Sequence, residues 1–272
     1  MSLSTPNEDG KPKPEGGPRA RRARIAEHVM KKGTVSVEDL VEFLGVSAMT
    51  VYRDIAALEE AGMLQRHYGK VTARASGLHE ASARFRMEQG REFKREIAAC
   101  VAAMIPPGSS VMLDDSTSGV WVIRALEDIV TMSIVTNSLL VSEEAERAGT
   151  GHLIIVGGAY QGWAESLVGP LAVKMIGEMH ASYAMVSASG IADGNCYHPY
   201  EEVVAVKRAM LEACDKKILL LDHTKFSRMA LFRFADMTEF DHVVVDRHTP
   251  DDVLRDLSER GVNVVLAPGL DA

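Results

Sequence analysis

Four short polar segments in the C-terminal two thirds of the chain carry the residue types that bind small anions. Small hydroxyl residues and glycines allow a ligand to approach the backbone, and free N–H groups at the start of a helix point at a bound anion. A nearby carboxylate and ammonium would suit sugar hydroxyls or a phosphate. We expect a small, polar, anionic ligand, and its candidate contacts are Asp114, Ser116, Thr117, Ser118, Thr136, Asn137, Ser138, Gly157, Gly158, Asp222 and Lys225.

Each of these segments also has a purely structural interpretation. Residues 114–118 and 136–138 could do no more than cap helices, since Asp, Asn and Ser are common N-cap residues. Asp222 and Lys225 could form a surface ion pair, and Gly157-Gly158 could only make a turn. Four such segments after strand-like stretches favour a shared ligand site over four unrelated structural features.

A second set of residues, nearer the N-terminus, suits contact with nucleic acid. Val51, Ile55 and Leu58 recur at helical spacing, so one helix face packs inward. Ser47 can cap this helix and Gly62 ends it. Side chains near the helix start, and those of a basic hairpin that follows, could reach base edges and phosphates. The candidate DNA contacts are Ser47, Ala48, Met49, Thr50, Tyr52, Arg53, Arg66, His67 and Lys70.

The neighbouring segments complete a recognisable unit. Arg24–Lys32 has helical spacing, and Ser36–Asp39 resembles a capping box that opens a second helix. Gly45-Val46 makes the tight turn into the third, which gives a helix-turn-helix arrangement. Met63–Arg66 and Val71–Ala73 can form the strands of the basic hairpin. A small helical bundle with a charged, solvated face is the alternative.

From Arg91 onward, helical and strand-like segments alternate, which predicts an α/β domain with a mainly parallel sheet and helices on both faces. Such sheets bind ligands at the carboxyl ends of their strands, where the four polar segments fall. The expected strands are 111–113, 133–135, 153–156, 183–186, 217–221, 242–245 and 262–266. The expected helices are 92–105, 120–126, 138–147, 170–177, 201–213 and 251–260.

The distribution of charge along the 272 residues agrees with the domain boundaries that the helix and strand patterns indicate. We expect a disordered tail over 1–18, a winged helix-turn-helix domain over 19–74, a linker with a short helix over 75–90 and the α/β domain over 91–272. The net charge is −8, yet the 19–74 segment holds ten Lys and Arg against seven Asp and Glu. The rest of the chain from residue 75 holds eighteen against twenty-eight. The basic segment is therefore the candidate for nucleic acid.

Several classes of function are disfavoured. No apolar run approaches the roughly 18 residues of a membrane span, so no membrane partner is expected. The three cysteines have no framework spacing and no signal peptide is evident, which predicts a reducing cytoplasm. Cys196 and His198 lie close together without a second ligand pair. We therefore expect neither a metal nor a cofactor.

The two halves together resemble DeoR-family transcriptional regulators. The N-terminal segment is similar to that family's winged helix at Ser47, Thr50, Val51, Arg53, Asp54, Leu58, Glu59, Gly62 and Arg66-His67-Tyr68-Gly69. The larger segment is similar to its effector-sensing domain at Leu113-Asp114, Thr136-Asn137-Ser138, Gly157-Gly158, Gly169 and Asp222-x-x-Lys225-Phe226. The resemblance spans about residues 19–266.

This resemblance implies a two-domain repressor that binds double-stranded operator DNA as a dimer or higher homo-oligomer. It implies a sensing domain folded like ribose-5-phosphate isomerase and the CoA transferases. The effector would be a phosphorylated sugar whose phosphate is held by residues 114–118 and 136–138, with Lys225 near the sugar or phosphate. The regulated genes would serve carbohydrate metabolism.

Two departures from the family pattern bear on this expectation. The first loop usually reads Asp-x-Gly-Thr-Thr, but here Ser116 replaces the glycine and would restrict access to the backbone. Asp115 adds a charge that would repel phosphate if it pointed inward. The recognition helix often has Arg-Arg-Asp, but Tyr52 stands in place of the first arginine, so one contact becomes aromatic.

Two other classes of function stay open at this point. The chain could be a sugar-phosphate isomerase-like enzyme with an appended winged helix, in which Asp114, Asp222 and Lys225 would serve acid–base or electrostatic roles. Alternatively, the winged helix could grip a protein partner. The sequence favours a DNA-binding regulator controlled by a phosphorylated sugar over both.

Overall fold

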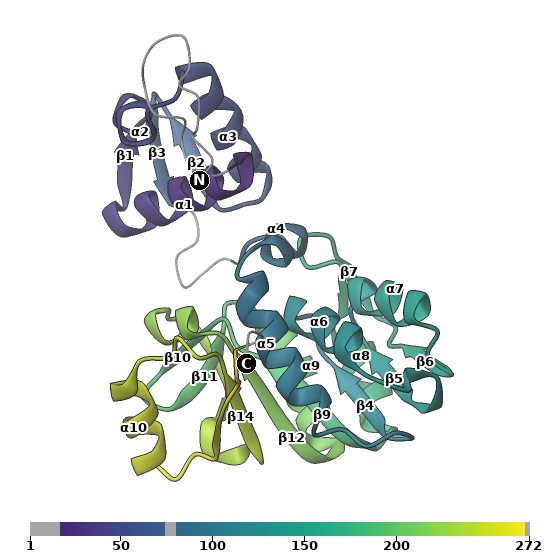
Figure 1. Ribbon diagram of the computed structural model, residues 1–272. Helices are drawn as coiled ribbons and strands as arrows, with labels where there is room; N and C mark the ends of the chain where they lie inside the picture. Colours follow the sequence, from purple (N-terminus) through teal and green to yellow (C-terminus); the bar gives the residue numbers. More distant parts are fainter. Residues whose placement is uncertain (1–16, 74–79, 270–272) are drawn as a thin grey trace, which may run out of the picture. The chain divides into compact units, whose positions relative to one another are not determined.

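A computed structural model of the chain describes residues 17–73 and 80–269 (Figure 1). The chain forms two compact units that divide between residues 75 and 76. The expected tail, apart from its last two residues, lies outside the described part. Residues 75–79 of the expected linker lie outside it too.

The smaller unit is a three-helix domain with a three-stranded antiparallel sheet in the order β1-β3-β2. Its helices are α1 (Pro18–Lys32), α2 (Val37–Leu44) and α3 (Ala48–Glu60), and its strands are β1 (Thr34–Ser36), β2 (Leu64–His67) and β3 (Lys70–Ala73). Apolar side chains from all three helices and from the sheet are buried together: Ile25, Val29, Leu40, Val51, Ile55, Leu58, Leu64 and Val71. The winged helix-turn-helix fold predicted from the sequence is therefore present.

Helix α1 begins six residues before the expected Arg24. A proline fits the first helical position, because its missing N–H would have no partner there. The added turn has a structural role, because Arg21 and Arg22 both bind the carboxylate of Asp54 in α3. The Arg22 Nε lies 3.1 Å from Asp54 Oδ1, and Asp54 is buried. This ion-pair cluster ties α1 to α3.

The connections around α3 follow the sequence signals. The Ser36 hydroxyl accepts a hydrogen bond from the Asp39 N–H at 3.0 Å, which completes the expected capping box. Gly45 has a left-handed φ of 65° at the turn between α2 and α3. At the other end of the unit, β2 and β3 are joined by Tyr68 and Gly69. Both have positive φ, 47° and 75°, as a two-residue hairpin turn of type I′ requires.

The larger unit contains a seven-stranded sheet in the order β15-β14-β12-β9-β4-β5-β6, and every pair of neighbours is parallel. Its strands are β4 (Ser110–Leu113), β5 (Ser133–Thr136), β6 (His152–Ile155), β9 (Ala181–Ser187), β12 (Cys214–Leu221), β14 (His242–Val245) and β15 (Val264–Leu266). The prediction of a parallel sheet is confirmed, with strand ends that differ by only a few residues.

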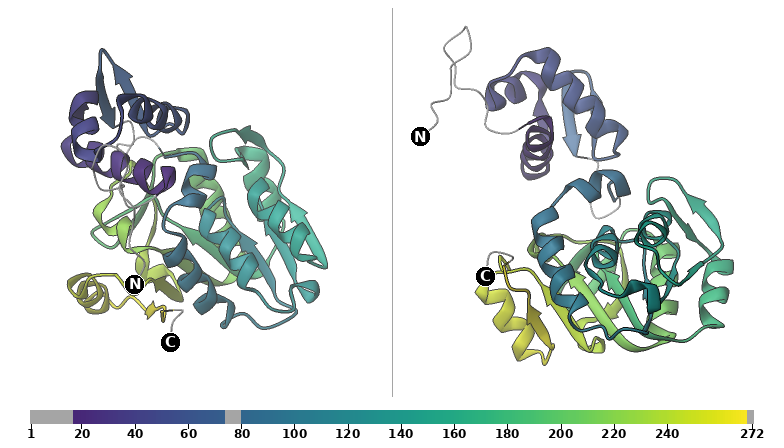
Figure 2. Two further views of the ribbon diagram at one scale, coloured as in Figure 1. Left: turned by 45° about the horizontal axis from the view of Figure 1, so that its top comes forward. Right: turned by 45° about the vertical axis from the view of Figure 1, so that its right-hand side comes forward.

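Helices cover both faces of this sheet (Figure 2). Those on one face are α5 (Arg91–Ala102), α6 (Thr117–Ala125) and α7 (Leu139–Ala148), and those on the other are α8 (Pro170–Gly177), α9 (Glu201–Glu212) and α10 (Asp251–Glu259). Successive residues of β4 show the alternation, since Val111 and Leu113 face α5–α7 while Met112 faces α8 and α9. The sheet is thus buried on both sides.

The larger unit also contains short elements. The short helix expected within residues 75–90 is α4 (Ala83–Glu88). The sequence did not indicate the antiparallel strands β10 (Gly190–Ala192), β11 (Asn195–His198) and β13 (Phe232–Asp236), the hairpin β7 (Ala159–Gln161) and β8 (Ser166–Val168), or the 3₁₀ turns η1 (Ile129–Thr131), η2 (His223–Ser227) and η3 (Met237–Glu239). Most span too few residues to show a periodic pattern.

The strand order reverses beside β4. After β4 the chain adds β5 and β6 on one side, and then crosses to β9, β12, β14 and β15 on the other. Ligands of open α/β sheets bind at such a reversal, outside the carboxyl ends of the strands. The loops that follow β4, β5 and β9 all begin there. Within the described ranges, no helix has the length and apolar character needed to cross a membrane.

Candidate functional site

The recognition helix α3 presents the predicted DNA contacts on its outer surface. Val51, Ile55 and Leu58 are buried against the rest of the smaller unit. Eight of the nine predicted contacts are exposed, and Thr50 is half-buried. The Ser47 hydroxyl caps the helix by accepting a hydrogen bond from the Thr50 N–H at 3.3 Å. The start of α3 therefore has a fixed backbone and a surface that is free to contact a partner.

The hairpin is attached to this helix by one arginine. The Arg66 N–H donates to Glu59 Oε1 at 2.8 Å, and its guanidinium lies over the Tyr52 ring, 5.2 Å from the ring centre. Tyr52 therefore supports Arg66 in addition to facing solvent. At the tip of the turn, Tyr68 is fully exposed between His67 and Lys70. The prediction did not include Tyr68, although its place in a two-residue turn is visible in the sequence.

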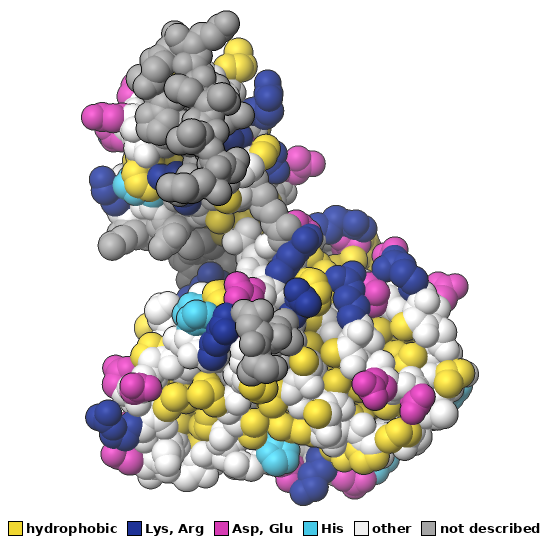
Figure 3. All heavy atoms as spheres, in the orientation of Figure 1, with side chains coloured by type: hydrophobic (Ala, Val, Ile, Leu, Met, Phe, Trp, Pro, Cys, Tyr) yellow, Lys and Arg dark blue, Asp and Glu magenta, His cyan; other side chains and the backbone are white. Residues whose placement is uncertain are grey.

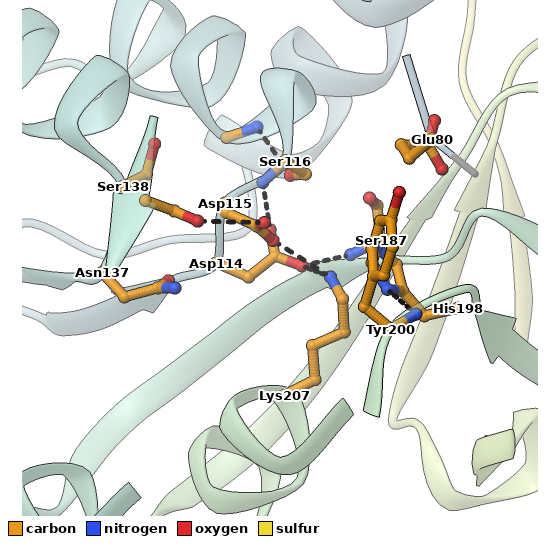
Figure 4. A network of polar contacts seen from close by, with 12 residues as sticks. Glu80, Asp114, Asp115, Ser116, Asn137, Ser138, Ser187, His198, Tyr200 and Lys207 are labelled. Carbon is orange, nitrogen blue, oxygen red and sulfur yellow. Dashed lines mark hydrogen bonds and ion pairs between the residues drawn. The ribbon is translucent and has the colours of Figure 1, made fainter. Parts of the chain in front are cut away.

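In the larger unit, Asp114 anchors the loop that follows β4 (Figure 4). Its Oδ1 accepts a hydrogen bond from the Ser116 N–H at 2.9 Å, and its Oδ2 accepts one from the Ser187 N–H at 2.9 Å. The Lys207 ammonium, which comes from α9, also binds Oδ2. Lys207 is only 2% exposed. Asp114 thus joins the ends of β4 and β9 to a helix on the far face of the sheet.

Asp115 is turned inward and is partly neutralised. Its Oδ1 lies 3.7 Å from the Lys207 Nζ, and its Oδ2 accepts a hydrogen bond from the Ser166 hydroxyl at 3.4 Å. Burial alone would lower the pKa of Lys207, but Asp114 and Asp115 outweigh it and raise that pKa. The condition stated for Asp115 is met, since it points inward, and the single Lys207 ammonium offsets only one of the two carboxylate charges.

The hydroxyl residues of the first two loops cap the following helices. Ser116 Oγ accepts a hydrogen bond from the Gly119 N–H at 3.2 Å, and Ser138 Oγ accepts one from the Val141 N–H at 3.3 Å. Thr136 Oγ1 donates to the Leu113 carbonyl at 2.7 Å, which ties β5 to β4. The capping interpretation is confirmed for both serines. Thr117 is buried and Ser118 half-buried at the start of α6.

Asn137 differs from its neighbours because half of its amide has no partner. Its Nδ2 donates to the Leu167 carbonyl at 3.0 Å, which fixes the orientation of the amide. Its Oδ1 is buried and accepts no hydrogen bond from the described residues. A buried acceptor without a donor is costly, by about 1–3 kcal/mol. This atom is therefore suited to a donor supplied by a ligand.

Gly157 and Gly158 have separate surroundings. A Cβ added to Gly158 would lie 2.5 Å from the Val168 carbonyl oxygen, so this glycine allows the close approach of β8. Gly157 is exposed, and a Cβ there would meet nothing within 4 Å. The close backbone approach predicted for this pair thus takes place within the protein at Gly158.

A second group of charges lies at the end of β12. Asp222 accepts a hydrogen bond from the Thr224 N–H at 3.0 Å and opens η2, which carries Lys225. Burial of Asp222 opposes its ionisation, but the charge of Lys225 holds its pKa below the ordinary value. Burial lowers the pKa of Lys225 despite the opposing charge of Asp222. The two predicted residues therefore do interact.

Three further charged residues surround this pair and were missed by the sequence analysis. Lys94 Nζ donates to the Arg86 carbonyl at 2.5 Å, and Arg86 Nε lies 4.0 Å from Glu80 Oε1. Burial and the nearby Lys225 lower the pKa of Lys94 to about 7. Burial opposes ionisation of Glu80, yet Lys225 and Arg86 hold its pKa at about 2. Arg86, Lys94 and Lys225 together form what we call the cation cluster.

His198 connects the cation cluster to the Asp114 loop. Burial lowers its pKa to about 3, and Lys207, Glu80 and Arg86 are all close enough to affect it. The ring is therefore neutral, and its Nδ1 accepts a hydrogen bond from the Tyr200 N–H at 3.2 Å. Figure 4 shows His198 and Tyr200 facing the Asp114–Lys207 pair. Both groups of charges thus belong to one polar region.

The visible surface of the larger unit has no dominant charge, and its described residues offer no metal site. Basic and acidic side chains are mixed on the visible face of the larger unit, without a continuous basic stripe (Figure 3). Within residues 17–73 and 80–269, no group of three or more His, Cys, Asp or Glu is arranged to hold a metal ion.

Comparison with known families decides the identity of both units. A family model described as the DeoR C terminal sensor domain matches residues 89–247. A second, described as the DeoR-like helix-turn-helix domain, matches residues 21–76. The chain belongs to the DeoR family.

Similar proteins of the DeoR family match over nearly the whole chain. The uncharacterized HTH-type transcriptional regulator YgbI of Escherichia coli K12 is 29% identical over 92% of this chain and 98% of its own length. The glycerol-3-phosphate regulon repressor of the same strain is 30% identical over 90% of this chain and 98% of its own. Among solved structures, ribose 5-phosphate isomerase A from Methanocaldococcus jannaschii matches 51% of this chain and 55% of its own at 13% identity, with a TM-score of 0.38.

Membership of the DeoR family confirms the predicted class of function. The smaller unit is a helix-turn-helix domain and the larger unit is a sensor domain, as the sequence indicated. The chain is a DNA-binding transcriptional regulator and not an isomerase-like enzyme. The individual contact residues on each unit stay predictions.

Proposed function

We propose that this DeoR-family chain represses genes of carbohydrate metabolism by binding operator DNA as a homo-oligomer, and that a phosphorylated sugar releases it. The observation that supports this most directly is the polar region at the strand ends of the sensor domain. There, the buried Asn137 oxygen after β5 has no donor among the described residues, and the cation cluster lies at the end of β12 in the same sheet. A ligand with both an anionic group and a hydroxyl would satisfy both features.

The DNA side of the proposal assigns a role to each exposed part of the smaller unit. Arg53 and Thr50 contact the major groove, with Ala48, Met49 and Tyr52 alongside them. Arg66, His67 and Lys70 contact phosphates from the hairpin. Ser47 caps the helix and binds a phosphate of the duplex in this assignment. Each chain has a single recognition helix, so at least two chains are needed to bind two half-sites.

The effector side of the proposal uses loops that are already rigid. The phosphate is held at residues 114–118 and 136–138, where helices α6 and α7 begin. Lys94 and Lys225 supply positive potential, and Asn137 Oδ1 accepts a sugar hydroxyl. Because Lys207 lies beside both Asp114 and Asp115, this loop carries one net negative charge instead of two and repels an anion less than two free carboxylates would.

Thermal denaturation of the full chain tests the effector proposal. A panel of sugar phosphates is compared with the parent sugars and with inorganic phosphate, because a ligand that binds only the folded state raises the melting temperature. We expect at least one sugar phosphate to stabilise the protein and its parent sugar to do so much less. Lys225→Met should reduce the effect, whereas Lys216→Met, at an exposed lysine of the same unit, should not. Equal stabilisation by the parent sugar would contradict the assignment.

A mobility shift with the DNA upstream of the chain's own coding region tests operator binding and its release by the effector. We expect salt-sensitive binding that the stabilising sugar phosphate reverses. Arg53→Ala should weaken it by on the order of 1–3 kcal/mol for each bound helix. Arg255→Ala, at an exposed arginine of α10, is the matched control. Failure to shift any such DNA at low salt would contradict operator binding.

A further inference from the structure

The outer surface of α8 carries apolar side chains together with two opposite charges. Leu171, Lys174, Met175 and Glu178 are spaced i, i+3, i+4 and i+7, so they share one side of the helix. All four are exposed, with Leu171 at 72% and Met175 at 37%. Together with Ile154 and Met179, they line a shallow hollow of about 420 Å³. We call these six residues the α8 surface.

The position of the α8 surface makes it more than a chance exposure of apolar side chains. Single exposed apolar residues are common on soluble proteins, but a contiguous apolar hollow is not. The hollow borders β6, the last strand of the sheet order, which has no neighbour on its outer side among the described strands. Edge strands are normally protected because they offer unpaired backbone groups to another chain.

The two charges on this surface have no partner among the residues that the structure describes. Among the described residues, neither the Lys174 ammonium nor the Glu178 carboxylate makes a hydrogen bond or an ion pair. They lie on the same side of the helix and have opposite signs. A two-fold symmetric contact brings each residue of one chain to its counterpart region on the other, so such a pair is complementary to a copy of itself.

We propose that the α8 surface joins two copies of this chain, with the two α8 helices antiparallel across a two-fold axis. A helix rises 1.5 Å per residue. If the axis passes beside Met175, Leu171 lies level with Met179 of the partner subunit. Lys174 then lies about 3 Å along the axis from Glu178 of the partner subunit. The apolar side chains fill the hollow, and two symmetric ion pairs close it at either end.

A second copy of the chain fits this surface better than another kind of partner does. With one charge of each sign the surface has no net attraction for DNA, and an apolar ligand would leave both charges unsatisfied. The inference rests on the proposed function, because that function needs two recognition helices in one assembly. It goes further by assigning the contact that holds the two chains together.

Sedimentation velocity of the full chain tests the proposal by charge reversal. Lys174→Glu and Glu178→Lys each place like charges across the axis, and each should weaken the association by about tenfold or more. The double variant, Lys174→Glu with Glu178→Lys, restores both pairs and should return the association to near the wild-type value. A double variant that is as weak as the two single variants would overturn the proposal.

A second comparison keeps the test independent of the ion pairs. Leu171→Asp should halve the mass of the assembly, whereas Leu231→Asp, at a leucine that is 58% exposed elsewhere on the same unit, should leave it unchanged. If all variants keep the wild-type mass, the α8 surface is not the contact, although the proposed function survives. If the wild-type chain is monomeric at all concentrations, both the contact and the proposed oligomer fail.

Discussion

Lys207 is a charged residue placed where an apolar one would be expected. It shares the packed side of α9 with Val203, Val206 and Met210, yet its ammonium is ionised because two carboxylates lie beside it. Burying three charged groups is costly, and the cost is offset only while every partner is present. The region around Asp114 therefore depends on Lys207 for both its shape and its charge.

Lys207→Met tests this dependence. The variant leaves Asp114 and Asp115 buried without a counter-charge, so the free energy of unfolding should fall by about 3–5 kcal/mol. Both tryptophans, Trp121 and Trp163, lie in the larger unit, so their fluorescence in a urea titration reports on that unit alone. Lys216→Met removes an exposed ion pair and should cost under about 1 kcal/mol. Equal losses in the two variants would contradict the argument.

Lys94 makes the stability of the larger unit depend on pH. Its pKa falls to about 7 in the folded chain from an ordinary value of 10.5. Between these values the unfolded state binds more protons than the folded state, so the free energy of unfolding rises as pH rises from 7 toward 10.

The comparison with Lys94→Met isolates this contribution. Between pH 7 and pH 9, the wild-type chain should gain about 2 kcal/mol relative to the variant in urea titrations followed by tryptophan fluorescence. Titration of groups that do not interact with Lys94 is common to both proteins and cancels in the difference. Parallel pH profiles for the two proteins would show that the Lys94 pKa is not lowered.

At the scale of elements, the recognition helix is held from two sides. Arg21 and Arg22 of α1 bind the buried Asp54, and Arg66 of β2 packs over Tyr52. The Asp54 side chain therefore cannot face DNA, although it lies next to Arg53 in the helix. Its role is to hold α3 against α1, so that the exposed side of α3 is presented in one orientation.

Asp54→Ala should loosen the smaller unit without changing its outer surface. We expect a loss of about 2 kcal/mol or more, because the substitution removes a buried carboxylate with two partners. Limited proteolysis mapped by mass spectrometry should show faster cleavage within residues 17–73. Glu60→Ala, at an exposed site at the end of the same helix, should leave the cleavage rate unchanged. No difference between the two variants would contradict the proposed role.

The elements that the sequence predicts well are those with a long apolar pattern. Lys217–Leu221 is apolar enough to indicate a buried parallel strand, and β12 contains it. Strands β10 and β11 have three and four residues with mixed polarity, so their pairing depends on tertiary contacts that no local pattern reveals. The same limit explains the missed charges. Lys94 and Lys207 interrupt the apolar sides of α5 and α9, but nothing local indicates which partners they meet.

The polar residues of the effector site also divide into those that the sequence could place and those that depend on the tertiary fold. Asp114, Thr136 and Asn137 follow strands that were predicted, so their gathering at one sheet edge could be foreseen. Arg86 and Glu80 lie before the sheet in sequence and reach its edge only through the fold of residues 80–90. The α8 surface was not foreseen, because exposed apolar residues on a helix are recognised only once the packed side is known.

At the scale of the whole molecule, the charge is divided between a basic segment, residues 19–74, which we call the head, and an acidic segment, residues 75–272, which we call the body. Residues 19–74 carry a formal excess of three positive charges, whereas the chain as a whole carries −8. Contacts from the head to phosphates release counterions, so operator affinity should fall steeply with salt. We expect the body to contribute little to this effect, since residues from 75 onward hold eighteen Lys and Arg against twenty-eight Asp and Glu.

Lys70→Ala measures one such contact. The slope of log affinity against log salt concentration should become shallower by about 1 for each bound chain, with a nearly uniform loss of affinity across DNA sequences. Lys216→Ala in the larger unit should leave the slope unchanged. Fluorescence anisotropy at several salt concentrations gives both slopes. An unchanged slope for Lys70→Ala would remove this residue from the DNA surface.

The Lys207 side chain reaches from α9 to the carboxyl end of β4. Val206 and Met210 of α9 pack in one cluster with Ile176 of α8. The ion pair between Lys207 and Asp114 therefore connects the loop after β4 to α9 and, through this packing, to α8. We expect an occupant of the Asp114 loop to shift α9 and α8 through this ion pair. On the proposals above, a small molecule at the strand ends would then alter how two chains meet without contacting their interface.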